Sequence, residues 1–323
     1  MRKSLWIKNF QIASIANLIL LTASCPIVAV PRQGPHEAAP IAYSPQLLAE
    51  LKQIQQAALG TDYAVRRLAV LTYKIGPRLS GSVQAQNAVD YVASELQRIG
   101  LDVRLEKVLV PHWIRGEEKA ELVKFPGQVS GMAQRIILTT LGGSVATPPT
   151  GLAAEVVTVD SFEELEALGR ANVEGKIVLF NRRFDERMAA QGFGLEAYRQ
   201  IVSYRTRGPS AAARLGAVAA LVRSAGGSNY RSPHAGFTRY AKDAAPIPAA
   251  ALAGEDADLI AGLSKEGPAH LRLTLSPQTL PDAVSYNVVA DLKGSEHPEQ
   301  VVIVSGHLDS WDLGTGAIDD GAV

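Results

Sequence analysis

The stretch that most restricts the fold is Gln300–Val323, which combines an apolar run, a histidine, glycines and acidic residues. Its apolar run, Val301–Val304, lies between a charged segment and Gly306, the pattern of a strand buried on both faces. Such a strand would place His307 at its carboxyl end. Asp309 follows two residues later, a spacing that keeps both side chains on one face of an extended chain. A carboxylate in that place accepts a hydrogen bond from one imidazole nitrogen and leaves the other nitrogen for a metal.

A glycine-rich segment leads from His307 to the acidic pair Asp319 and Asp320, and Gly321 follows directly. Glycine lets the backbone turn back toward the strand end, so the histidine and the acidic residues are expected to converge on one point. We therefore predict a metal site there. Asp320 is interpreted as holding its turn by hydrogen bonds to backbone amides. From the residues alone, a second interpretation stays open, in which both motifs are ordinary capped turns.

Composition sets outer limits on the function. The 323 residues are 47% hydrophobic and 20% charged, which is enough to bury a sizeable core and favours two folded units over one. With 32 basic and 32 acidic residues the formal net charge is zero, so nucleic acid is not expected as a partner. The single cysteine, Cys25, excludes a disulfide within the chain.

Residues 1–29 have the pattern of an export signal. Basic residues at the start precede the apolar stretch Ile12–Leu21, which is too short to span a bilayer comfortably, and small residues follow. Two processing routes stay open: cleavage after Ala29, or a lipid anchor on Cys25, because Thr-Ala-Ser before that cysteine resembles a bacterial lipoprotein box. Either route predicts an exported protein that is periplasmic, secreted or anchored to the cell envelope by lipid.

Helical periodicity marks the region that follows. It predicts helices over Pro45–Leu59, with Ser44 as N-cap, over Asp62–Lys74 and over Val83–Ile99. Alternating apolar and polar residues then predict a half-buried strand over Leu101–Pro111, which the proline is expected to end. The sequence therefore begins with helices that lead into a sheet.

A shift to glycine, proline, threonine and serine around Phe125–Gly151 marks the entry to an inserted unit. Within it, strands such as Gly175–Phe180 and Ala217–Val222 alternate with helices, which predicts a small mixed domain. No group of nucleophile, base and metal ligands gathers in its sequence. His234 is its one histidine in a suitable loop, and we interpret it as structural or solvent-facing.

The order of these pieces resembles a known family. The segments IGPRLSGS, GKIVLF, SYNVVADLKG and above all SGHLDSWDLGTGAIDDGA are similar to those of secreted zinc exopeptidases, the co-catalytic aminopeptidase and carboxypeptidase family, of the carboxypeptidase Q type. The resemblance implies an α/β fold: a zinc-exopeptidase sandwich with a mostly parallel central sheet, here incomplete. It further implies a peptidase domain that begins over 30–125, an inserted smaller protease-associated domain over 126–280 that shapes substrate access, and the start of the zinc-binding core over 281–323.

The resemblance also implies roles for three residues. His307 would bind one zinc ion, Asp319 would bridge two zinc ions, and Asp309 would serve the catalytic site by orienting His307. Two zinc ions roughly 3.5–4 Å apart need a shared anionic oxygen, which a carboxylate supplies. The expected substrate is a short peptide with a free terminus, hydrolysed by metal-activated water. Carboxypeptidase, aminopeptidase and dipeptidase action stay open.

The sequence departs from the family pattern after its Asp-Asp-Gly motif. In relatives a glutamate base, an acidic ligand, another aspartate and a second histidine follow, and zinc normally takes at least three protein ligands. We therefore expect the 323-residue polypeptide to be a fragment, a truncated gene product or a degenerate copy, inactive as a peptidase by itself.

Two further expectations follow. An incomplete sheet leaves an apolar flank uncovered, which predicts poor solubility or association, in the simplest case as a homodimer. The alternative function is that of a non-enzymatic exported binding protein that uses the protease-associated domain. A serine hydrolase is not supported, because no Gly-x-Ser-x-Gly turn occurs.

Overall fold

The computed structural model describes residues 43–227 and 230–317. The predicted export signal, Cys25, Asp319 and Asp320 lie outside the described residues. The chain divides into two compact units, Met1–Gly60 and Thr61–Val323.

The described part of the first unit is helix α1, Pro45–Leu59, as the periodicity predicts. Ser44 caps it, since its hydroxyl accepts a hydrogen bond from the Leu47 amide at 3.1 Å. Gly60 ends it, with its amide 2.8 Å from the carbonyl of Gln56. No residue of α1 is buried, so within its own unit the helix depends on these local interactions.

The second unit opens with helices that lie near the predicted bounds. They are α2, Tyr63–Ala69, a π-helical segment η1, Val70–Ile75, and α3, Val83–Arg98. Ser82 caps α3 through a 3.1 Å hydrogen bond from the Ala85 amide. The helix buries Ala85, Ala88, Val89 and Ala93 along one stripe.

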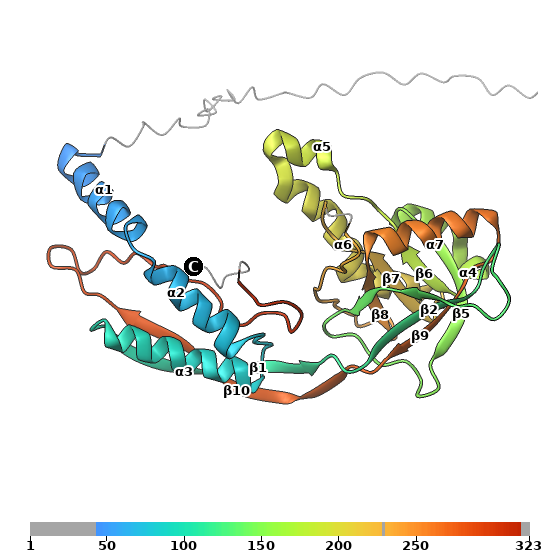
Figure 1. Ribbon diagram of the computed structural model, residues 1–323, viewed down its shortest axis with the longest axis horizontal. Helices are drawn as coiled ribbons and strands as arrows, with labels where there is room; N and C mark the ends of the chain where they lie inside the picture. Colours follow the sequence, from blue (N-terminus) through green and yellow to red (C-terminus); the bar gives the residue numbers. More distant parts are fainter. Residues whose placement is uncertain (1–42, 228–229, 318–323) are drawn as a thin grey trace, which may run out of the picture. The chain divides into compact units, whose positions relative to one another are not determined.

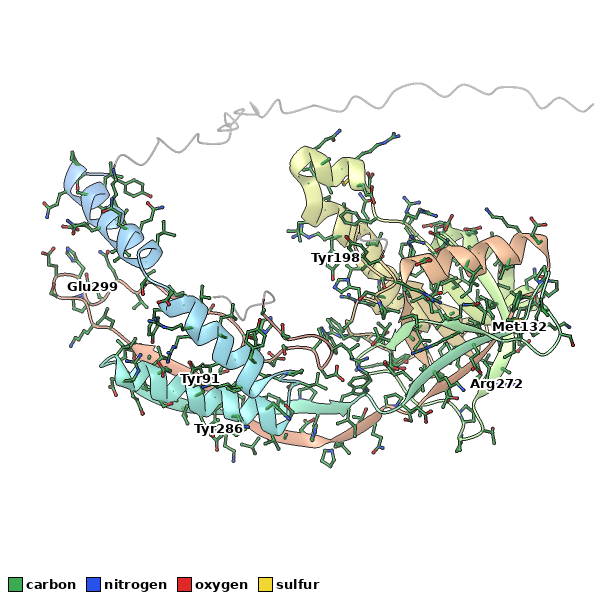
Figure 2. The ribbon with its side chains drawn as sticks, in the orientation of Figure 1. Tyr91, Met132, Tyr198, Arg272, Tyr286 and Glu299 are labelled. Atoms are coloured by element: carbon green, nitrogen blue, oxygen red, sulfur yellow. The ribbon has the colours of Figure 1, made fainter. Side chains whose placement is uncertain are left out.

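Two long strands form a separate antiparallel ribbon beneath α3 (Figure 1). They are β1, Asp102–Ile114, and β10, Gln278–Asp291. Figure 2 labels Tyr91 on α3 and Tyr286 on β10. The prediction that Pro111 ends the first strand is wrong. The register shifts between Val110 and His112, and this bulge accommodates a residue that has no amide hydrogen to donate.

The remaining strands form an eight-stranded sheet in the order β3-β2-β9-β5-β6-β7-β8-β4. Their bounds are, in chain order, β2 Glu118–Lys124, β3 Gln134–Ile136, β4 Leu138–Thr140, β5 Leu152–Val159, β6 Ile177–Phe180, β7 Ala219–Arg223, β8 Ala249–Leu252 and β9 His270–Leu275. The accompanying helices are α4 Phe162–Val173, α5 Glu186–Met188, the π-helical η2 Ala189–Phe193, α6 Gly194–Arg214 and α7 Gly254–Glu266.

This sheet is rolled rather than flat. Strands β3 and β4 lie at opposite ends of the strand order, yet only Ile137 separates them in the chain. In a flat sheet of eight strands with a spacing of about 4.8 Å, the two edge strands would lie about 30 Å apart or more. The single residue that connects these two edge strands can span only about 3.5 Å. The sheet must therefore curl until its two edges meet near Ile137.

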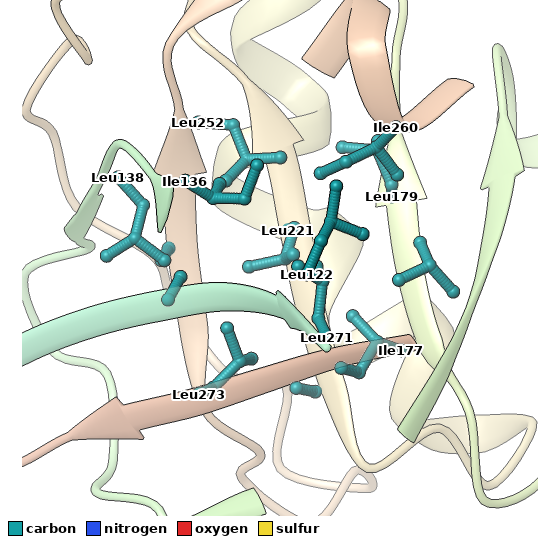
Figure 3. Close-up of a cluster of buried hydrophobic side chains, with 14 of the residues drawn as sticks. Leu122, Ile136, Leu138, Ile177, Leu179, Leu221, Leu252, Ile260, Leu271 and Leu273 are labelled. Carbon is teal, nitrogen blue, oxygen red and sulfur yellow. The ribbon is translucent and has the colours of Figure 1, made fainter. Parts of the chain in front are cut away.

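The rolled sheet is buried on both faces, and alternate residues of its central strands serve two different cores. Ile177 and Leu179 of β6 face the cluster that Ile260 of α7 covers, shown in Figure 3. Val178 and Phe180 face the opposite cluster, with residues of α4 and α6. The predicted buried strand at this position is confirmed, and its continuous apolar sequence follows from having a core on each side.

The fold is α/β, as predicted, but its large sheet is mixed and not mostly parallel. Three of its pairings are parallel, β5-β6, β6-β7 and β7-β8, and the other four are antiparallel. The parallel sheet expected around His307 is not formed by the described residues. The division at 126 and 280 stays a prediction; the strands of the eight-stranded sheet come from 118–275. Among the described helices, none has the length and apolarity needed to cross a membrane.

Candidate functional site

The segment before His307 is not the buried strand that its sequence predicts. Val301–Val304 have no regular secondary structure and are 77–90% exposed. An apolar run becomes a buried strand only where neighbouring strands supply hydrogen bonds and cover its faces. Within residues 43–227 and 230–317 no strand pairs with this run. The consequence is an uncovered apolar segment directly before the candidate site.

His307 and Asp309 do lie together. The Nδ1 atom of His307 is 3.2 Å from Oδ1 of Asp309 and 2.8 Å from its backbone carbonyl oxygen. The two side chains are about half exposed, at 46% and 53%. With Nδ1 turned to Asp309, Nε2 is the ring nitrogen that a metal would use. The roles that the sequence assigns to both residues stay predictions.

Asp319, the predicted bridging ligand, lies outside the described residues. Over the described ranges, no group of three or more His, Cys, Asp or Glu side chains is arranged to hold a metal ion. An imidazole backed by a carboxylate suits zinc chemically, because zinc-binding histidines usually donate their second ring N–H to an oxygen. The chemical type of these described residues therefore suits zinc, but one histidine alone is too few ligands to hold the ion.

Arg78 organises the loop that carries these residues. Its side chain is fully buried, at 0% exposure. Its Nε donates to the carbonyl of Leu308 at 2.7 Å, and Nη2 donates to the carbonyl of Gly316 at 2.8 Å. Its backbone exchanges two 3.0 Å hydrogen bonds with Ser310, amide to hydroxyl in one direction and Ser310 amide to Arg78 carbonyl in the other. Arg78 thus contacts the loop on both sides of Asp309.

Burial has an electrostatic effect on Arg78. Loss of water lowers the pKa of its guanidinium, and the negative charge of Asp309 acts in the opposite direction. Gly316 allows the close approach that this geometry requires. Its φ is +60°, and a Cβ atom there would overlap Ser310 and lie 2.8 Å from Nη2 of Arg78.

A second buried arginine, Arg115, holds the next turn of the loop. It binds both carboxylate oxygens of Asp312, at 2.8 and 2.6 Å. It also contacts Glu118 at 3.0 Å, and through Thr139 and Thr140 it reaches β4. Burial opposes the charge on Arg115, but the two carboxylates outweigh that effect and raise its pKa. This network joins the candidate site to the eight-stranded sheet.

Trp311 adds a packing contact between the candidate loop and the eight-stranded sheet. A Cβ atom placed on Gly142 would lie only 2.5 Å from the Trp311 ring, so glycine at this position lets the indole lie against the backbone that follows β4. Arg115 and the backbone at Gly142 therefore hold Asp312 and Trp311, respectively.

Sequence reasoning missed Arg78 and Arg115. Both lie in short segments next to glycine or proline, and the first is in the IGPRLSGS motif, which was interpreted only as a turn. The one sequence feature that could have indicated their role was an arginine inside such a turn. His234 is held by the structure of its loop, since its amide donates to the Ser224 hydroxyl at 2.8 Å, in agreement with a structural role.

Two surface hollows occur elsewhere in the second unit. One, of about 480 Å³, is lined by residues 117–120 and 135–138, and the other, of about 440 Å³, lies between α7 and the ends of β5 and β6. Neither is lined by His307 or Asp309.

Known proteins resemble this chain in sequence. Residues 287–323 match Peptidase family M28. Carboxypeptidase Q from Homo sapiens and that from Bos taurus are each 41% identical over 257 residues, which is 79% of this chain and 51% of theirs. The chain therefore spans about half the length of these curated relatives.

Solved structures resemble it in fold. The peptidase M28 precursor from Shewanella amazonensis SB2B has a TM-score of 0.75 and 38% identity, over 85% of this chain and 60% of that one. A zinc aminopeptidase from Bacillus subtilis has a TM-score of 0.54 and 21% identity, over 80% of this chain and 53% of that one, a likeness of fold.

Proposed function

Because the chain belongs to peptidase family M28, we propose that it forms part of the metal site of a zinc exopeptidase that hydrolyses short peptides. In this proposal His307 would be a zinc ligand, Asp309 would orient it, and Asp319 would be a further zinc ligand that two ions could share. Bound zinc would activate a water molecule by lowering the pKa of that water toward about 7.

The observation that carries the proposal is the contact between His307 and Asp309. A carboxylate oxygen 3.2 Å from Nδ1 and a carbonyl oxygen 2.8 Å from the same atom both favour the tautomer that carries its proton on Nδ1. That tautomer presents the lone pair of Nε2 for coordination. The chain's own contribution is thus a histidine with a set orientation, on a loop that two buried arginines hold.

The region 126–280 is proposed as a protease-associated domain that shapes access to the site. Support comes from contacts between this region and the candidate loop. Gly142 lies against Trp311, and Thr139 and Thr140 accept hydrogen bonds from Arg115, which in turn binds Asp312. A domain that served only as an attachment for the protein would not need contacts with the residues that follow His307 and Asp309.

Export is proposed for residues 1–29, with Cys25 as the site of a lipid anchor. The support is the order of basic, apolar and small residues in that segment. Mass spectrometry of the mature amino terminus tests it. A diacylated Cys25 supports the anchor, cleavage after Ala29 supports secretion without one, and an intact Met1 contradicts both.

The peptidase proposal is tested on protein isolated from the cells that produce it. We expect hydrolysis of short peptides that a chelator abolishes and zinc restores. The change His307→Ala should abolish it, whereas His297→Ala, at an exposed histidine 67% accessible to solvent, should leave it unchanged. Peptide hydrolysis that is insensitive to chelators, or no hydrolysis at all, would contradict the proposal.

Zinc binding by the 323-residue polypeptide is tested separately from peptide hydrolysis. Calorimetric titration should show weak zinc binding that His307→Ala removes and His297→Ala retains. Complete absence of a metal response would instead favour a binding protein.

A further inference from the structure

We propose that Arg78 is a positioning residue that holds Leu308–Gly316 in the shape that presents His307 and Asp309, before any metal binds. This inference rests on the proposed function for its consequence, metal affinity. Its structural basis, the contacts of one buried guanidinium, is independent of that function.

The guanidinium joins two segments that are far apart in the sequence, 71–76 and 308–316. One arm, Nη1, donates to the carbonyls of Leu71, within the π-helical segment, and of Gly76, directly after it, at 3.1 and 3.0 Å. The same nitrogen reaches Thr315 at 3.4 Å, while Nε and Nη2 reach Leu308 and Gly316. All five acceptors are neutral backbone carbonyls. A fixed planar fork can contact them together, whereas the single ammonium of lysine cannot.

The contacts of Arg78 involve the residues directly before and directly after Asp309 in the sequence. Leu308 is held by the Arg78 side chain, and Ser310 is held by the Arg78 backbone through two 3.0 Å hydrogen bonds. Because hydrogen bonds hold the residues on both sides of Asp309, its backbone conformation is restricted, which limits where its side chain and its carbonyl can point. Those two groups are the ones that orient His307.

The far end of the loop is fixed by the same arginine. Gly316 packs against Ser310 so closely that no Cβ atom fits, and its carbonyl accepts from Nη2. The loop thus closes on itself around Arg78. Every bond in this arrangement joins groups of the protein, so the shape needs no metal ion to form.

Burial makes the arrangement sensitive to the identity of residue 78. A charged group at 0% exposure is costly unless it is hydrogen-bonded, and here each of its three nitrogens donates to at least one carbonyl. A shorter side chain, or one with a single cationic nitrogen such as lysine, would leave several of these carbonyls buried without a donor. The loop would then open to admit water, and His307 would lose its fixed orientation.

The test is hydrogen exchange of metal-free protein, followed by zinc titration. In Arg78→Lys and Arg78→Gln we expect the Ser310 amide to exchange at least about tenfold faster, while amides of β6 and β7 keep their protection. Zinc affinity should fall by about tenfold or more, the usual effect of losing an outer contact to a metal ligand. In Arg78→Ala, added guanidinium ion should restore part of the Ser310 protection.

Two controls separate this inference from general stability and from the proposed function. Arg223→Lys alters another buried arginine, which pairs with Asp258, and should leave Ser310 exchange unchanged. His307→Ala should abolish zinc binding without speeding Ser310 exchange. Unchanged Ser310 protection in both Arg78 variants overturns the inference, and so does an equal loss of protection throughout the chain. If the unaltered protein binds no zinc, the proposed function fails, and the exchange data alone decide whether Arg78 holds the loop.

Discussion

Two glycines in the candidate loop allow a sharp test of its packing, because both have positive φ but only one is crowded. Gly316 has a φ of +60° and Gly314 a φ of +87°. Alanine at either position should cost about 1–2 kcal/mol for a left-handed backbone. A Cβ atom on Gly314 meets nothing within 4 Å, whereas one on Gly316 overlaps Ser310 and lies 2.8 Å from Arg78.

The difference between the two variants isolates the steric contribution. Overpacking of this kind typically adds about 1–3 kcal/mol. The reduced freedom of the unfolded chain, about 0.4–1 kcal/mol in favour of alanine, is the same for both and cancels. We therefore expect Gly316→Ala to destabilise the loop by about 1–3 kcal/mol more than Gly314→Ala.

The assay is native-state hydrogen exchange at the Ser310 amide, which donates to the carbonyl of Arg78. Its protection reports the free energy of opening this loop rather than of unfolding the whole unit. Urea unfolding of both variants provides the global value for comparison. Equal protection of Ser310 in the two variants would refute the close packing of Gly316 against Ser310 and Arg78.

Three further predictions concern charge and exposure. Asp312→Ala should destabilise the second unit in urea unfolding by about 1.5–3 kcal/mol, because Arg115 loses two hydrogen bonds to a charged partner; no loss would contradict the network. A hydrogen bond from Arg214 holds the pKa of the Asp243 carboxyl below its ordinary value. The stability that this ionised pair provides is therefore present above the unfolded-state pKa of Asp243 and is lost as pH falls through the folded-state pKa. Arg214→Gln should raise that pKa in carbon-13 NMR titration, and an unmoved titration would refute the pairing. Val302→Asp, at a side chain 90% exposed, should leave stability unchanged and reduce self-association in gel filtration, whereas a monomeric unaltered chain would contradict the expected association.

The sequence predicted local structure well where short-range chemistry decides it. Ser44 and Gly60 mark the ends of α1, and the cap and breaker residues around α3 place that helix within one residue. In both helices a side chain three positions away satisfies the first amides, so the signal lies entirely within a short window.

Strands show where sequence patterns stop being sufficient. Ile177–Phe180 and Val301–Val304 are both apolar runs of four, yet the first is buried and the second is 77–90% exposed. The first lies between β5 and β7, and the second has no partner among the described strands. Burial of a strand depends on its neighbours, which periodicity does not specify.

The arginine contacts of the site were beyond sequence reasoning for a related reason. Arg78 and the loop it holds are separated by 230–238 residues, so no local pattern links them. His307 and Asp309, by contrast, are two residues apart, and their proximity could be predicted from spacing alone. Pairings within a motif were thus accessible, while the groups that hold the motif in place were not.

The central claim is that His307, set by Asp309 in an arginine-held loop, binds zinc. X-ray absorption at the zinc edge of zinc-loaded protein tests it most directly, because imidazole gives a distinctive outer-shell scattering pattern with a Zn–N distance of about 2.0–2.1 Å. The account predicts that this imidazole signal diminishes in His307→Ala and persists in His297→Ala. An imidazole signal unchanged by His307→Ala would contradict it.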